Sequence, residues 1–175
     1  MFAVEHEKLE SGLFRGVGKV IQTLAKDYRL ILVSTNDLSN VKNNLEKHGL
    51  GRYFSELFCS DLKGAGIRGD KAIAIMQVLE RDKLHEKEVI LIGDKAADFK
   101  EGKKAGLSQV LLVEYGWGYK PDSIPEYERR YIVRNPKQLI QVIRKIESAT
   151  MSRPKALALR TKHLFGRVPL IRKRR

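Results

Sequence analysis

Residues that could hold a phosphate group and a metal ion occur at three places in this sequence. Two of these places follow short apolar runs, and the third is the start of a helical pattern. Asp94 comes shortly after the apolar run at residues 89–92, and Asp98 lies four residues further on. Two carboxylates on a tight turn supply the oxygen ligands that Mg²⁺ prefers. Lys71 begins a helical pattern and would add a positive charge for an anion. We therefore predict a metal site formed by Asp94 and Asp98, with Lys71 binding an anion nearby.

The third place is the polar triplet Ser34-Thr35-Asn36, which follows an apolar run at residues 29–33. A hydroxyl group and an amide at the start of a helix can hold phosphate oxygens, because helix N-termini favour anions. We predict that Thr35, Asn36 and Lys71 bind the phosphate of a substrate, with Ser34 as an alternative to Thr35.

Each of these features also has a purely structural explanation. The triplet could be a turn that caps the next helix, and Asp98 could be an ordinary N-cap. Lys71 beside Asp70 could form a solvated ion pair at an exposed helix start. Asp94 is harder to explain in this way, because a carboxylate at the end of a buried strand needs a partner. The whole set in this order is therefore more specific than any of its members.

The hydrophobic pattern alternates between helical and strand periods from about residue 17 onward. Apolar residues at helical spacing predict helices near residues 17–24, 38–45, 72–79, 98–105 and 139–146. Short apolar runs predict strands near residues 29–33, 57–59, 89–92, 110–113 and 131–133. This alternation is typical of a parallel sheet with helices on both faces, whose ligands bind at the carboxyl ends of the strands. We predict a three-layer, Rossmann-like α/β fold.

The composition is that of one globular domain followed by a basic segment. The chain has 175 residues, of which 42% are hydrophobic and 31% charged, and no apolar run approaches the roughly 20 residues that a membrane helix needs. The net charge is +13, but nine Lys and Arg residues lie from residue 151 onward, where there is no Asp or Glu, so the first 150 residues carry +4. We expect a cytoplasmic protein, because the N-terminus lacks a signal-peptide pattern and Cys59 is the only cysteine.

In these motifs the chain resembles the haloacid dehalogenase superfamily, and within it the phosphoglycolate-phosphatase-like branch. The resemblance extends over roughly residues 15–147. The matching motifs are Thr35-Asn36 at a strand end, Lys71 at a helix start, Gly93-Asp94 with Asp98 after the best strand, and the aromatic-glycine loop at residues 115–119.

The resemblance implies the three-layer fold of this superfamily, here without a full cap domain, together with a reaction and a cofactor. It implies a Mg²⁺-dependent phosphatase that acts on a small phosphorylated metabolite. Thr35 would hold the phosphate, and Lys71 would neutralise the attacking group and the developing charge. Asp94 and Asp98 would hold Mg²⁺ or position its waters, so the catalytic residues that the resemblance implies are Lys71 and Asp94.

The sequence departs from this family at the attacking residue. In the family an aspartate on the first strand attacks the phosphoryl group, and a second aspartate two residues later acts as general acid and base. No Asp-x-Asp precedes Thr35. Either the chain begins within the helical cap that many relatives insert after the first strand, or residues 2–4 are a shortened first strand with Glu5 and Glu7 in place of the two aspartates.

These observations divide the chain into three parts and leave three functions open. Residues 1–16 are predicted to be a cap remnant or a degenerate first strand, 17–148 the core domain, and 149–175 a flexible basic tail. The first function is a Mg²⁺-dependent phosphomonoester hydrolase of the phosphoglycolate-phosphatase type, incomplete or degenerate at the nucleophile. The second is a catalytically inactive phosphate- or partner-binding remnant of the fold. The third is a module whose basic tail binds nucleic acid or an anionic membrane surface.

Overall fold

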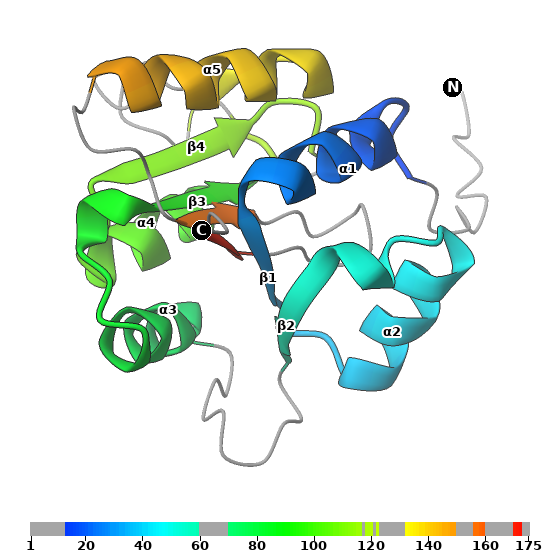
Figure 1. Ribbon diagram of the computed structural model, residues 1–175, viewed down its shortest axis with the longest axis horizontal. Helices are drawn as coiled ribbons and strands as arrows, with labels where there is room; N and C mark the ends of the chain where they lie inside the picture. The colour runs from blue at the N-terminus through cyan, green and yellow to red at the C-terminus, as the bar shows by residue number, and fades with distance from the viewer. Residues whose placement is uncertain are drawn as a thin grey trace, which may run out of the picture.

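A mostly parallel sheet forms the centre of the computed structural model (Figure 1). The structure describes residues 13–59, 70–116, 118–120, 122 and 132–149, and the course of the chain in two strands nearer the C-terminus. The strands are β1 (Arg29–Val33), β2 (Phe54–Phe58), β3 (Val89–Gly93), β4 (Gln109–Val113), β5 (Ile132–Val133), β6 (Ala156–Leu159) and β7 (Leu170–Arg172). Their order across the sheet is β2-β1-β7-β6-β3-β4-β5, with a further pairing between β1 and β6. All pairings among the described strands are parallel except those of β7, so the predicted parallel α/β fold is confirmed.

Helices cover both faces of this sheet and complete the predicted three layers (Figure 1). They are α1 (Val17–Asp27), α2 (Leu38–Lys47), α3 (Lys71–Arg81), α4 (Ala96–Lys104) and α5 (Pro136–Ala149), and short 3₁₀ turns lie at Gly51–Tyr53 and Glu86–Glu88. The buried residues of α1, α2 and α5 pack with Leu30 and Leu32 of β1 on one face. Those of α3, with Ala105 just after α4, pack with Ile31 and Val33 on the other. Successive residues of a strand point to opposite faces, so β1 serves both cores.

The spacing of apolar residues explains where the helices form, and glycine explains where one of them ends. In α1 the side chains of Val17, Val20, Ile21 and Leu24 form one buried stripe, as their spacing at i, i+3, i+4 and i+7 requires. Gly106, which follows α4, has a φ of 81° that few other residues adopt, so the helix ends there as predicted. Among the described helices, none is long and apolar enough to cross a membrane.

One strand boundary differs from the prediction. We predicted a strand at residues 57–59, but β2 runs from Phe54 to Phe58 and leaves the buried Cys59 outside it. The early part of β2 contains the polar residues Ser55 and Glu56, and β2 lies at the edge of the described sheet. An edge strand tolerates polar side chains that a search for apolar runs does not detect.

The C-terminal segment contributes two strands to the sheet. β6 pairs in parallel with β1 at Arg29 and Leu30, and with β3 from Val89 to Ile92. β7 pairs antiparallel with β6. The sequence analysis expects residues 149–175 to be a flexible basic tail, and both strands lie within that range. Facing strand edges need partners for their backbone N–H and C=O groups, and a short apolar run can provide them. The other boundaries stay predictions, since residues 1–12 lie outside the described part of the chain.

A chain that ends at Ala149 tests the contribution of β6. Because β1 and β3 would lose the strand that pairs with both, we expect a lower urea midpoint and a less cooperative transition than in the full chain, measured by circular dichroism. An unchanged midpoint would show that residues 150–175 add no stability, as a flexible tail would.

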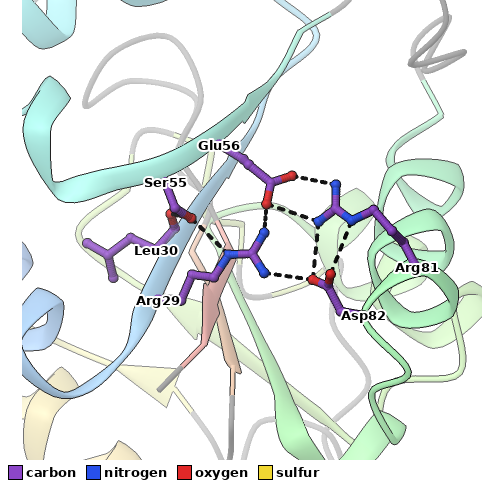
Figure 2. Close-up of polar contacts among 6 residues, drawn as sticks. All are labelled: Arg29, Leu30, Ser55, Glu56, Arg81 and Asp82. Carbon is purple, nitrogen blue, oxygen red and sulfur yellow. Dashed lines mark hydrogen bonds and ion pairs between the residues drawn. The ribbon is translucent and has the colours of Figure 1, made fainter. Parts of the chain in front are cut away.

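A network of two arginines and two carboxylates fastens β1, β2 and α3 together at the amino end of β1 (Figure 2). Arg29 of β1 forms ion pairs with Glu56 of β2 and, at 2.7 Å, with Asp82 just after α3. Arg81 binds the same two carboxylates, through a pair of N–H donors at 2.8 and 2.9 Å to Glu56 and through Nε at 3.1 Å to Asp82. Such two-pronged arginine contacts are stronger than single exposed ion pairs. The network therefore fixes the C-terminus of α3 on the sheet.

Substituting Asp82→Asn tests this network. Burial acts to raise the pKa of Asp82, but Arg81 and Arg29 outweigh it, so the pKa lies below its usual range. Asp82 therefore stabilises the fold above the unfolded-state pKa of about 4, and this stability is lost as pH falls through the lower folded-state pKa. We expect Asp82→Asn to lower the free energy of unfolding at neutral pH by about 1 kcal/mol. The variant should also lack the loss of stability that the wild-type chain shows when Asp82 is protonated at low pH. Urea titrations at several pH values would measure both effects.

The exposed Glu80 offers a matched control for Asp82→Asn, since it lies on the same helix. Glu80→Gln removes a carboxylate without touching the network drawn in Figure 2. Equal losses of stability in the two variants would contradict the assignment.

Candidate functional site

Asp98 is the centre of the polar contacts at the carboxyl end of β3. Its Oδ2 accepts hydrogen bonds from the backbone N–H groups of Asp94, at 3.1 Å, and Lys95, at 3.0 Å. Its Oδ1 lies 3.8 Å from Nζ of Lys71, at the start of α3. Asp94 and Asp98 are completely buried and Lys71 is 5% exposed. Because a buried carboxylate is stable only with such partners, the turn after β3 and the start of α3 are arranged around Asp98.

The structure excludes one explanation of Asp98, that of an ordinary N-cap. The N-cap of α4 is Lys95, so Asp98 is the third residue of the helix and not its N-cap. From there its carboxylate reaches back to the N–H groups that precede the helix, as the acidic residue of a capping box does. The spacing of four residues between Asp94 and Asp98 therefore closes the turn.

Asp94 is held by the aromatic-glycine loop that follows β4. Gly118 donates its N–H to Oδ2 of Asp94 at 2.8 Å. A Cβ atom at Gly116 would lie 2.1 Å from Cβ of Asp94, so only glycine lets this loop approach so closely. The sequence analysis noted this loop for its resemblance and did not predict that it would contact Asp94. The available signal was the pair of glycines, Gly116 and Gly118, which lie three and five residues after the end of β4.

Lys71 points to Asp98 and not to its neighbour in sequence. Asp70 is the N-cap of α3, with its side chain accepting from the N–H of Ala72, and its ion pair is formed with Lys104 of α4. The explanation of Lys71 and Asp70 as a solvated pair is therefore wrong. Lys71 is a buried cation at a helix N-terminus, which is a setting suited to an anion.

The triplet after β1 lies at the same edge of the sheet. Ser34 is buried, donates its N–H to the carbonyl of Phe58, and accepts the N–H of Asn36 on its Oγ at 3.0 Å. Ser34 thus forms the turn, while Thr35 and Asn36 are only half-buried. β1 and β3 are both parallel to β6 and end at the same edge, two strand spacings or about 10 Å apart.

The structure therefore brings Lys71, Asp94 and Asp98 into one cluster and places Thr35 and Asn36 across β6 from it. The sequence analysis missed three contributors to this cluster: the N–H of Gly118, Glu101 of α4, which accepts the N–H of Ala72, and Lys104. Their contacts join residues that are far apart in the sequence, so no local pattern could predict them.

The described residues provide a small donor set for a metal ion. They contain no group of three or more His, Cys, Asp or Glu side chains that could hold one. Mg²⁺, however, is often held by one or two carboxylates together with waters and substrate phosphates. Two completely buried carboxylates beside one lysine fit such a site, and the metal roles predicted for Asp94 and Asp98 stay predictions.

Comparison with known proteins places the chain in a family. Residues 2–112 match the family model described as haloacid dehalogenase-like hydrolase. A pyrophosphatase PpaX from Listeria welshimeri is 25% identical over 134 residues, which cover 75% of this chain and 59% of that protein. A solved structure assigned as a beta-phosphoglucomutase from Thermotoga maritima superposes with a TM-score of 0.58 at 17% identity, over 75% of this chain and 59% of the other.

The fold and the match over most of the chain define one class of protein. The chain belongs to the haloacid dehalogenase-like hydrolases, as the resemblance of its motifs predicted. It spans about 59% of the length of the Listeria pyrophosphatase.

Gly93→Ala tests the packing of the turn around Asp98. A Cβ at Gly93 would lie 2.4 Å from Cβ of Asp98, which is held by α4 and cannot move away freely. We expect the variant to lose about 1–3 kcal/mol of unfolding free energy, because overpacking must displace buried atoms. Gly51→Ala is the control, since its added Cβ meets nothing closer than 3.9 Å. Similar urea midpoints for both variants would contradict the close packing of Gly93 on Asp98.

Proposed function

We propose that this chain is a Mg²⁺-dependent phosphomonoester hydrolase of the phosphoglycolate-phosphatase type, acting on a small phosphorylated metabolite. The observation that carries the proposal is the buried cluster of Lys71, Asp98 and Asp94 at the carboxyl end of β3. Membership of the haloacid dehalogenase-like hydrolases supports it, as does the name of the Listeria pyrophosphatase, which also refers to a phosphate compound.

Different residues of the site would bind the phosphate and the metal ion. Lys71 places its ammonium group at the start of α3, where it would bind a phosphoryl oxygen and offset negative charge that develops during transfer. Thr35 would donate its hydroxyl from the end of β1, and Asn36 would offer its N–H and side-chain amide. Asp94 would hold Mg²⁺, and Asp98 would keep Asp94 and Lys71 in position. Bound Mg²⁺ would neutralise charge on the phosphoryl group.

The attacking group is the part that the described residues do not contain. The resemblance places an aspartate nucleophile on the first, central strand of the sheet, and the central strand between β1 and β3 is here β6, Ala156–Leu159, which has no acidic residue. Glu5 and Glu7, the predicted substitutes, lie outside the described part of the chain.

This composition of β6 favours a second candidate function, a catalytically inactive protein that binds phosphate through the same cluster. Both functions need Lys71, but only hydrolysis needs an attacking carboxylate. The third hypothesis, binding of nucleic acid or a membrane surface by the basic C-terminal residues, gains no support from the residues that the structure describes.

Turnover of p-nitrophenyl phosphate and of pyrophosphate, with Mg²⁺ or with EDTA, separates the two functions. We expect Mg²⁺-dependent hydrolysis, lowered by at least about 100-fold in Lys71→Met and in Asp94→Asn, because each removes a charge at the reacting group. The exposed residues Lys42 and Asp27 supply the controls Lys42→Met and Asp27→Asn.

Three results would revise the proposal. Binding of inorganic phosphate without turnover, lost in Lys71→Met, would establish the inactive binding protein instead. Turnover unaffected by Asp94→Asn would show that the site is elsewhere. If the chain showed neither turnover nor phosphate binding, that result would overturn both functions.

A further inference from the structure

Helix α4 contacts the start of α3 at three successive points. The residues of α4 involved are Asp98, Glu101 and Lys104, which recur every third position and so lie along one side of the helix. Their partners are the three consecutive residues 70–72. The contacts are Asp98 to Lys71, Glu101 to Ala72 and Lys104 to Asp70. The first belongs to the site already described, whereas the other two have no part in the proposed chemistry.

Glu101 makes the central contact of this set. Its Oε2 accepts the backbone N–H of Ala72 at 2.9 Å, and the same N–H also lies 3.1 Å from Oδ1 of the N-cap residue Asp70. This N–H is one of those at a helix start that no carbonyl of the helix can satisfy. Asp70 alone would satisfy it, as N-cap residues usually do. Glu101 adds a second acceptor that comes from another helix, and thereby ties the backbone next to Lys71 to α4.

The charges around this contact are balanced across the two helices. Burial raises the pKa of Glu101, and a hydrogen bond with Asp70 raises it further. The pKa of Asp70 moves the other way, because its side chain is hydrogen-bonded to Lys104 and to Glu101. Two carboxylates thus converge on one N–H group, with a lysine beside them to offset their repulsion. A glutamate that only faced solvent on α4 would not need a lysine to offset this repulsion.

We propose that Glu101 is a positioning residue for phosphate binding, which sets the direction of Lys71 by fixing the N–H of Ala72 to the helix that carries Asp98. The inference rests on the proposed function only for the identity of the ligand. Lys71 and Ala72 are adjacent, and Asp98 and Glu101 are one helical turn apart. The side-chain contact at 3.8 Å and the backbone contact at 2.9 Å therefore hold the first turn of α3 against α4 at two places. Loss of the backbone contact frees this turn to move relative to Asp98.

Two substitutions at position 101 separate the acceptor from the charge. In Glu101→Gln the amide oxygen still accepts the N–H of Ala72, and the amide N–H can donate to Asp70. In Glu101→Ala both are lost. By isothermal titration with inorganic phosphate in the presence of Mg²⁺, we expect Glu101→Ala to bind about tenfold more weakly than the wild-type chain and Glu101→Gln to bind within about twofold of it.

Leu79→Ala is the control for a general loss of stability. Leu79 lies on α3, partly buried against the same core as Ile75 and away from the helix start. We expect it to lower the urea midpoint at least as much as Glu101→Ala while leaving phosphate affinity unchanged. Equal affinities for Glu101→Ala and the wild-type chain would overturn the inference, and so would an equal loss of affinity in Leu79→Ala.

Amide hydrogen exchange at Ala72 keeps the inference testable if the wild-type chain binds no phosphate. That result would refute the proposed function, but the contact between the helices would still be measurable. We expect exchange at Ala72 to be faster in Glu101→Ala than in Leu79→Ala when each is compared at equal stability, and close to wild type in Glu101→Gln. Unchanged exchange in Glu101→Ala would show that Glu101 does not hold the start of α3.

Discussion

The burial of the Asp98 carboxylate is the constraint on which the rest of this structure depends. With no exposure to water, its two oxygens must find partners within the protein, and they find them in the N–H groups of the turn after β3 and in Lys71. α4 must therefore begin close behind β3, and residue 93 must lack a side chain that would collide with Asp98. The start of α3 must also lie near enough for Lys71 to reach. A strand and two helices are thus positioned by one acidic side chain.

Helix α3 is fixed at both ends by charged groups. At its C-terminus, Asp82 joins the arginine network with β1 and β2 (Figure 2), which lies at the amino end of β1. At its N-terminus, α4 holds residues 70–72, near the carboxyl ends of the strands. Between these ends, apolar side chains such as Ile75 and Val78 pack on the sheet. Apolar packing tolerates small sliding movements, whereas ion pairs and hydrogen bonds are directional, so the charged ends determine where along the sheet Lys71 lies.

The sequence predicted the features that depend on neighbouring residues. The buried runs of β1 and β3 are apolar throughout, and the turn from Asp94 to Asp98 closes within five residues, so both could be recognised locally. The contacts that join distant residues could not. Nothing near Glu101 indicates that it accepts the N–H of Ala72, and nothing near Gly118 indicates that it donates to Asp94. The polar start of β2 was missed for a related reason, because its place at the edge of the sheet is a property of the whole fold.

The position of β6 explains why the groups that would hold a phosphate and the group that would attack phosphorus come from different parts of the chain. A parallel strand between β1 and β3 brings their carboxyl ends to one edge of the sheet, and its backbone does so whatever its side chains are. The groups that would hold a phosphate come from β1, α3 and the turn after β3, so they need only that backbone. Attack on phosphorus would instead need a carboxylate carried on or near the central strand, which Ala156–Leu159 does not provide. The two requirements therefore fall on different parts of the chain.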